Sequence, residues 1–155
     1  MALLGDGFPA EKRRAFVEGK LVPGCIMRIE VKFPETTKPK FLVLVADDDP
    51  DCCLFIVNSA IHPFVAARPH LLKCQVEIDA ANHAFLKRDS YLACDKTLRL
   101  RKSEVVAELM KDIGGVQGKI SAHVRAEIVA AVKFALTLSP AEKANILASL
   151  LCQPA

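Results

Sequence analysis

The alternation of apolar and polar residues predicts strands over most of the first hundred positions of the chain. Apolar side chains occupy every second position of residues 25–33, which predicts a strand with one buried face. Two short apolar runs, FLVLVA (41–46) and CLFIVN (53–58), flank the turn DDDPDC and indicate a buried hairpin. Residues 72–78 alternate again, and residues 90–100 predict a further strand. The segment PETTKPK between the first two strands is expected to be a loop because it holds two prolines.

Helical patterns dominate the remainder. Helices are expected at 9–20, at 80–88, and from Ser103 to about residue 111, before Gly114 and Gly115. GKIS (118–121) predicts one short strand, and Ser121 is expected to begin a long helix. The motif SPAE (139–142) is typical of a capping box that opens a final helix to about residue 151. Strands followed by helices favour an α+β fold with a small antiparallel sheet or barrel.

Composition narrows the class of protein. The chain has 155 residues, 52% of them hydrophobic and 25% charged, which suits one folded domain and excludes general disorder. No apolar run approaches the roughly 18 residues of a membrane span. The first residues show no secretion signal, so we expect a cytoplasmic protein whose six cysteines are reduced.

Charge and metal-ligand patterns are less informative. The net charge of +3 is too small to indicate nucleic-acid binding by itself. Four aspartates gather between 47 and 51, whereas residues 87–102 are locally basic. The cysteines and histidines include no CxxC or HxxxH spacing, and so predict neither a metal site nor another cofactor. No glycine-rich nucleophile elbow or phosphate loop is present either.

Several short motifs, taken in chain order, carry a resemblance to a known family. They are Gly-Cys-Ile-Met (24–27), Lys-Pro-Lys (38–40), Val-Asn-Ser (57–59), Tyr-Leu-Ala-Cys-Asp-Lys-Thr (91–97) and Gly-Lys-Ile-Ser (118–121). Their succession resembles the MazF/PemK/Kid toxins of bacterial toxin–antitoxin systems over residues 21–138. Residues 1–20, an N-terminal helical extension, and residues 139–155, a C-terminal helix packed on the same domain, lie outside it.

The resemblance implies a fold, an activity and partners. It implies an SH3-like, CcdB/PemK-like antiparallel β-barrel with C-terminal helices, acting as a homodimer. It also implies a metal-independent endoribonuclease that cuts single-stranded RNA and is blocked by an antitoxin peptide. The family's arginine falls on Lys38, and its hydroxyl residue on Ser59. Lysine lacks the two-pronged contact that arginine makes to phosphate, so a non-catalytic relative that binds protein or nucleic acid is the alternative.

Chemistry assigns roles to the residues around these motifs. Cleavage of RNA needs acid–base groups and positioned donors near the phosphate. Lys38, Ser59 and His62 are the catalytic candidates: a cation, a hydrogen-bond donor and a group that titrates near neutral pH. The candidates for binding nucleic acid are Lys40, Asp95, Lys96, Arg99 and Arg101. Each has a plain alternative as a solvated surface residue, a turn residue or an exposed pair at a strand end.

Overall fold

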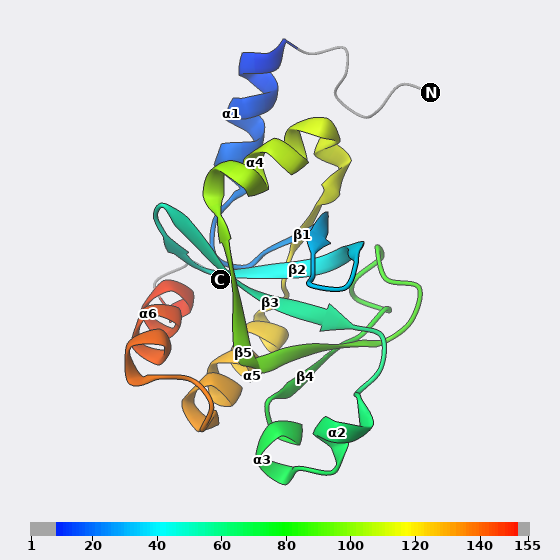
Figure 1. The fold of residues 1–155 in the computed structure, drawn as a ribbon, viewed down its shortest axis with the longest axis vertical. Coiled ribbons are helices and arrows are strands. Elements are labelled where there is room, and N and C mark those ends of the chain that lie inside the picture. Colours follow the sequence, from blue (N-terminus) through cyan, green and yellow to red (C-terminus); the bar gives the residue numbers. More distant parts are fainter. Residues whose placement is uncertain (1–8, 152–155) are drawn as a thin grey trace.

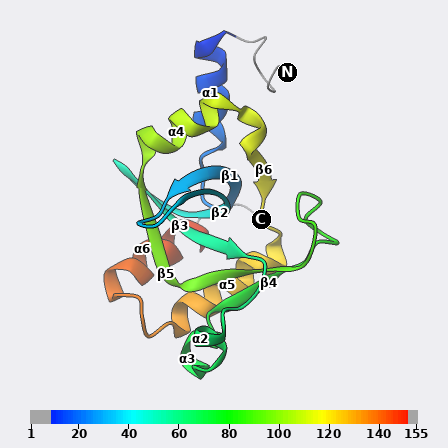
Figure 2. The same cartoon turned by 45° about the vertical axis from the view of Figure 1, so that its right-hand side comes forward.

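The computed structural model describes residues 9–151 and consists of one antiparallel sheet with helices on both faces (Figures 1 and 2). Its helices, including one 3-10 helix η1, are α1 (Ala10–Lys20), α2 (Pro63–Ala66), α3 (Pro69–Leu72), α4 (Lys102–Lys111), η1 (Ile113–Gly115), α5 (Ala122–Phe134) and α6 (Pro140–Leu151). Its strands are β1 (Cys25–Lys32), β2 (Thr37–Asp48), β3 (Asp51–Asn58), β4 (Gln75–Ile78), β5 (Ser90–Arg101) and β6 (Val116–Lys119). The predicted α+β class is confirmed.

The six strands form one antiparallel sheet in the order β4-β5-β3-β2-β1-β6. Within the described residues β4 and β6 pair with one neighbour each, so the sheet is open and the predicted closed barrel is wrong. Instead of pairing with β4, β6 leads into α5, and α5 packs against β4 and β5. The two edge strands, β6 and β4, are therefore connected through α5 and its side-chain packing, and not by backbone hydrogen bonds to each other.

Each face of the sheet carries a separate hydrophobic core. One core gathers Val43, Val45, Phe55 and Leu92 beneath α5 and α6, whose Ile128 and Ile146 are fully buried. The opposite core gathers alternate residues of the same strands, such as Leu42, Leu44 and Leu54, beneath α1 and α4. The central strands are buried on both faces, which explains why their sequences are uninterrupted apolar runs.

The helix starts that a serine was expected to cap are confirmed for α5 and α6. The Val124 N–H donates to Ser121 Oγ at 3.2 Å. Ser139 and Glu142 form the reciprocal capping box, with both hydrogen bonds at 3.1 Å. The expected cap of α4 at Ser103 is wrong, since this helix begins at Lys102 directly after β5, without a side-chain cap.

Two further predictions fail for a local physical reason. No helix forms at 80–88, because the Asp89 and Asp79 carboxylates accept the backbone N–H groups of Ala80 and Asn82 at 2.8 and 3.2 Å. Such side-chain bonds compete with helical ones. The expected loop at 34–40 is largely strand, since β2 begins at Thr37 and the chain reverses in a tight turn closed between Phe33 and Thr36.

Both terminal helices pack on the sheet domain. Val17 of α1 is fully buried, and Arg13 Nη2 donates to the carbonyl oxygen of Met110 in α4 at 2.5 Å. α6 contacts β2 and α5. The parts of the predicted extensions at residues 1–8 and 152–155 lie outside the described residues. None of the helices between residues 9 and 151 is long and apolar enough to cross a membrane.

Candidate functional site

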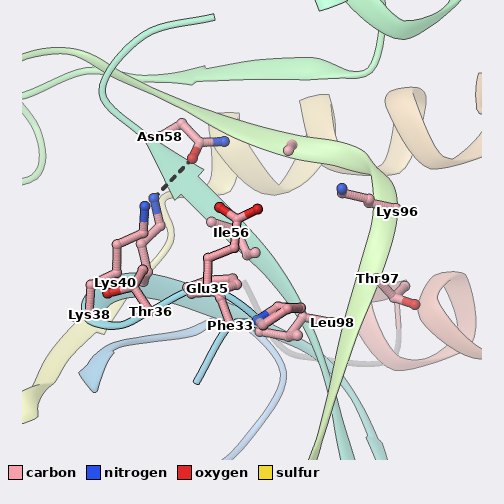
Figure 3. Close-up of a pocket in the computed structure, with 12 residues that line it drawn as sticks. Phe33, Glu35, Thr36, Lys38, Lys40, Ile56, Asn58, Lys96, Thr97 and Leu98 are labelled. Atoms are coloured by element: carbon pink, nitrogen blue, oxygen red, sulfur yellow. Dashed lines mark hydrogen bonds between the residues drawn. The ribbon is translucent and has the colours of Figure 1, made fainter. Parts of the chain in front are cut away.

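α4 covers only part of its face of the sheet, and the uncovered part is hollowed by two adjoining cavities of about 590 and 650 Å³. Together they form what we call the groove. The first lies between the β1–β2 hairpin, β3 and β5 (Figure 3). The second continues over the segment after β3 toward α2. They adjoin, since both are lined by Lys40, Asn58, Ala93 and Lys96.

The start of β2 places two lysines on the groove side of the sheet. Lys38 pairs with Val31 of β1, and Lys40 pairs with Ile29, both of which face the core beneath α4. Lys40 Nζ donates to Asn58 Oδ1 of β3 at 3.0 Å (Figure 3). Burial lowers the pKa of the Lys40 ammonium, and the charge of Lys38 lowers that pKa further. The two predicted cations are therefore neighbours on a rigid strand.

The segment that follows β3 contributes Ser59 and His62 to the second cavity. His62 is the N-cap of α2, where its Nδ1 accepts the backbone N–H of Phe64 at 3.0 Å. In a neutral ring, this bond leaves the proton on Nε2. His62 therefore offers a donor, Nε2–H, whereas the predicted proton shuttle needs a nitrogen that can accept.

The middle of β5 supplies Asp95 and Lys96. Both line the second cavity, and Lys96 also lines the first. The Asp95 carboxylate accepts a hydrogen bond from Gln75 Nε2 at 3.3 Å, and its backbone carbonyl accepts one from the Thr137 hydroxyl. Six of the eight predicted site residues thus line one groove, although they come from three separate segments of the chain.

The remaining two predicted residues, Arg99 and Arg101, lie away from the groove. They bind the acidic β2–β3 turn: Arg99 pairs with Asp48 and Asp51, and Arg101 pairs with Asp51 at 3.6 Å. The hydrogen bond that Arg99 donates to the Asp48 carboxylate raises the pKa of Arg99. The acidic turn and the last residues of the basic strip stand apart in the sequence but neutralise one another in the fold, which weakens the case for an RNA contact there.

The groove cations have a different electrostatic setting. Within residues 9–151, none of Lys38, Lys40 and Lys96 forms an ion pair. Lys38 Nζ instead lies 5.5 Å from the centre of the Phe33 ring. The groove therefore presents three lysine ammonium groups to an anionic ligand.

Two groove residues were not anticipated from the sequence. Glu35, in the β1–β2 turn, lines the same cavity as Lys38 and Lys40 and is the carboxylate nearest in the chain to them (Figure 3). Asn58 holds Lys40 in place. The sequence contains a signal for Glu35, since this residue lies in the turn before the Lys-Pro-Lys motif. For Asn58 the only signal in the sequence is its position at the end of an apolar strand, because its hydrogen-bond partner depends on strand register.

None of the cysteines that the structure describes lines the groove. The five that the structure describes, Cys25, Cys52, Cys53, Cys74 and Cys94, are all buried and without disulfides. Burial raises the pKa of three of these thiols, those of Cys25, Cys52 and Cys53, to about 11. Among residues 9–151, no three histidine, cysteine or carboxylate side chains lie together as metal ligands would. The described chain offers no candidate metal centre.

Comparison with known proteins adds no family assignment. The sequence matches no model of a known protein family, and no curated protein matches it significantly. The groove and the short motifs that line it are therefore the features of this chain that indicate a function.

Proposed function

We propose that this chain is a metal-independent endoribonuclease of the MazF/PemK/Kid toxin type, acting on single-stranded RNA in the groove. The observation that carries the proposal is that Lys38, Ser59 and His62 line two adjoining cavities. The sequence motifs and the chemistry of these side chains predict the same three residues. The groove also holds a carboxylate, Glu35, which completes the set of groups that the reaction needs.

The reaction is an attack of a ribose 2′-oxygen on the adjacent phosphorus. Glu35 takes the proton of the 2′-hydroxyl as general base, and the new 2′-O–P bond forms. The P–O5′ bond breaks, and the leaving oxygen takes a proton from the Lys40 ammonium. Burial and the neighbouring Lys38 lower the Lys40 pKa, which makes this group a better acid. The products are a 2′,3′-cyclic phosphate and a 5′-hydroxyl end.

The other groove residues stabilise charge that develops on the phosphate oxygens. Lys38 supplies a full positive charge, and the Ser59 hydroxyl and the His62 Nε2–H donate hydrogen bonds. Asn58 positions Lys40 through the 3.0 Å bond between them. Lys96, on the opposite side of the groove, binds a flanking phosphate (Figure 3). Asp95 orients Gln75 at the end of the groove.

The fold is consistent with an opened relative of the SH3-like barrel that the resemblance implies. β2 and β5 each run 12 residues, and each pairs with two neighbours. Register shifts interrupt the pairing of both strands with β3, which allows the sheet to bend. As parts of the same proposal, the chain acts in a cytoplasm as a homodimer, and an antitoxin peptide blocks the groove.

The test is induction of the wild-type chain in a bacterial host, beside Lys38→Ala and Glu35→Gln, followed by primer extension on total RNA. Lys111→Ala, a change at an exposed lysine of α4 outside the groove, is the matched control. We expect defined cuts with the wild type and the control, and none with the two groove variants. Cuts that persist in both groove variants would place the chemistry elsewhere.

The second candidate is a groove that binds RNA or a peptide without cutting it. Two observations favour it: lysine occupies the position of the family's arginine, and the His62 Nδ1 atom is engaged by the backbone. Soluble wild-type protein that binds single-stranded RNA, but yields no cuts and no growth defect, would establish this reading.

A further inference from the structure

A third cavity, of about 630 Å³, lies on the opposite face of the sheet from the groove, between the strands and the 79–89 segment. We call it the cleft. Among the described residues, its lining combines four cations with two aromatic rings and includes no carboxylate. The cations are Arg28, Lys40, Lys87 and Arg88, and the rings are Phe41 and Phe85. A cavity of this composition suits a ligand with both negative charge and a flat apolar ring.

The aromatic part of the cleft is ordered by its own contacts. The rings of Phe41 and Phe85 lie 5.2 Å apart at 43°, and both are half-buried. The Arg28 guanidinium lies 5.8 Å from the centre of the Phe41 ring. Each ring retains accessible surface on which a planar group can stack, next to a delocalised cation.

The segment that carries Phe85, Lys87 and Arg88 is held rigidly although it has no regular structure. His83 is buried, and its Nδ1 lies 2.9 Å from the carbonyl oxygen of Asp79. The Ser90 hydroxyl donates to the carbonyl oxygen of Arg88 at 3.1 Å, and the Asp89 carboxylate binds the Ala80 N–H. The two cations are therefore presented over the cleft from an anchored loop.

The cations of the cleft form no ion pair in the described part of the chain. Within residues 9–151, Arg28, Lys87 and Arg88 form no ion pair, in contrast to Arg99 and Arg101 at the other end of the sheet. Guanidinium and ammonium groups beside aromatic rings are the usual means of holding a single-stranded nucleotide: the base stacks and the cations bind the phosphates.

The cleft and the groove meet at a shared rim. Lys40 lines all three cavities, and Ser59 lines both the cleft and the second cavity of the groove. A strand of RNA whose phosphate lies at Lys40 and Ser59 can therefore continue over the ends of β2 and β3 into the cleft.

From these observations we infer that the cleft binds a nucleotide flanking the cleavage site on the same RNA strand. This inference rests on the proposed function. The base stacks on Phe85 or Phe41, and Arg28, Lys87 and Arg88 bind its phosphates. The chain then binds its substrate on both faces of the sheet and stacks against a base outside the reacting dinucleotide.

The test is an NMR titration of the full chain with each of the four ribonucleoside monophosphates and, separately, with inorganic phosphate. Four proteins are compared: the wild type, Lys87→Glu/Arg88→Glu, Lys38→Ala, and the control Lys111→Glu/Lys133→Glu. The control makes the same change in net charge at exposed lysines of α4 and α5. We expect saturable shifts at Arg28, Phe41 and residues 85–90.

In Lys87→Glu/Arg88→Glu the affinity for the nucleotide is expected to fall at least about tenfold, because two charge-assisted phosphate contacts become repulsive. At the cleft, which Lys38 does not line, the other three proteins are expected to bind alike. Shifts confined to the groove, equal loss in the control, binding of phosphate as tight as that of every nucleotide, or no binding would each overturn the inference.

The two proposals fail separately. RNA cuts that are abolished by Lys38→Ala, with a cleft that binds no nucleotide, would retain the ribonuclease and remove the second contact. A cleft that binds nucleotide in a protein that cuts no RNA would remove the ribonuclease, and with it the inference that both faces hold one cleaved strand.

Discussion

The salt dependence of RNA binding measures how many lysines and arginines contact phosphate. Each phosphate neutralised on a single strand contributes about −0.7 to the slope of log K against log salt concentration. The groove offers Lys38, Lys40 and Lys96, which predicts a slope of about −2 for the groove alone. The cleft adds Arg28, Lys87 and Arg88, which brings the predicted slope to about −4.

These slopes correspond to large and distinguishable effects. Between 50 and 200 mM salt, a slope of about −2 weakens binding roughly 20-fold, whereas a slope of about −4 weakens it roughly 300-fold. The assay is fluorescence anisotropy with a mixed-sequence pool of 2′-O-methyl RNA oligonucleotides. This probe resists cleavage because it lacks the attacking hydroxyl, and the counterion term does not depend on sequence.

Variants assign the slope to particular residues. Lys38→Ala/Lys96→Ala is expected to make it shallower by about 1.4 units, that is, about 0.7 for each lost phosphate contact. Arg99→Ala/Arg101→Ala is the matched control and is expected to leave the slope unchanged, because those arginines already pair with Asp48 and Asp51. The reasoning is refuted if the arginine variant flattens the slope as much as the lysine variant does.

Three further predictions concern stability. Gly115→Ala should lower the free energy of unfolding by about 1–3 kcal/mol, because its Cβ would lie 2.7 Å from the backbone oxygen of Arg28. Gly19→Ala, a change in open space within α1, should not lower it. Equal urea unfolding midpoints for these two variants would contradict the prediction. The pKa of Glu142 in the folded state is lowered, first by the hydrogen bond from the Ser139 backbone N–H and then by the one from the Thr97 hydroxyl. The Glu142 carboxylate therefore contributes to stability above pH 4.5, and this contribution is lost as the pH falls through the lowered value. Acid unfolding should show less pH dependence in Glu142→Gln. The pKa values of three buried thiols, those of Cys25, Cys52 and Cys53, are raised from 9.0 to about 11 in the folded state. Their contribution to stability is therefore complete below pH 9 and is lost as the pH rises toward 11, by about 1 kcal/mol per thiol at pH 10. Urea unfolding at about pH 7.5 and 10 should show a smaller loss of stability at the higher pH when any one of these cysteines is replaced by alanine.

Local signals in the sequence were sufficient for most of the secondary structure. Alternation of apolar residues predicts β1, and the capping box at Ser139 predicts the start of α6, because both signals lie within a few neighbouring positions. They fail where a side chain competes for the backbone, as Asp79 and Asp89 do around the expected helix at 80–88. A prediction from apolar spacing alone does not include that competition.

The groove was predictable only in part. The Lys-Pro-Lys motif and the polar end of β3 predict Lys38 and Ser59 from the sequence alone. The bond between Lys40 and Asn58, 18 residues apart, depends on the register between β2 and β3. The neutralisation of Arg99 by Asp48, 51 residues apart, depends on the pairing of β3 with β5.

The sequence by itself determined the α+β class, the buried central strands and the two serine-capped helices, because each of these follows from interactions between near neighbours in the chain. Only the tertiary structure decided that the sheet stays open, that one basic cluster is neutralised while another is not, and that a cleft with aromatic rings lies behind the groove. Those properties depend on which distant segments pair. The pairing follows from the burial of two opposite faces of the sheet at once, which no short stretch of sequence encodes.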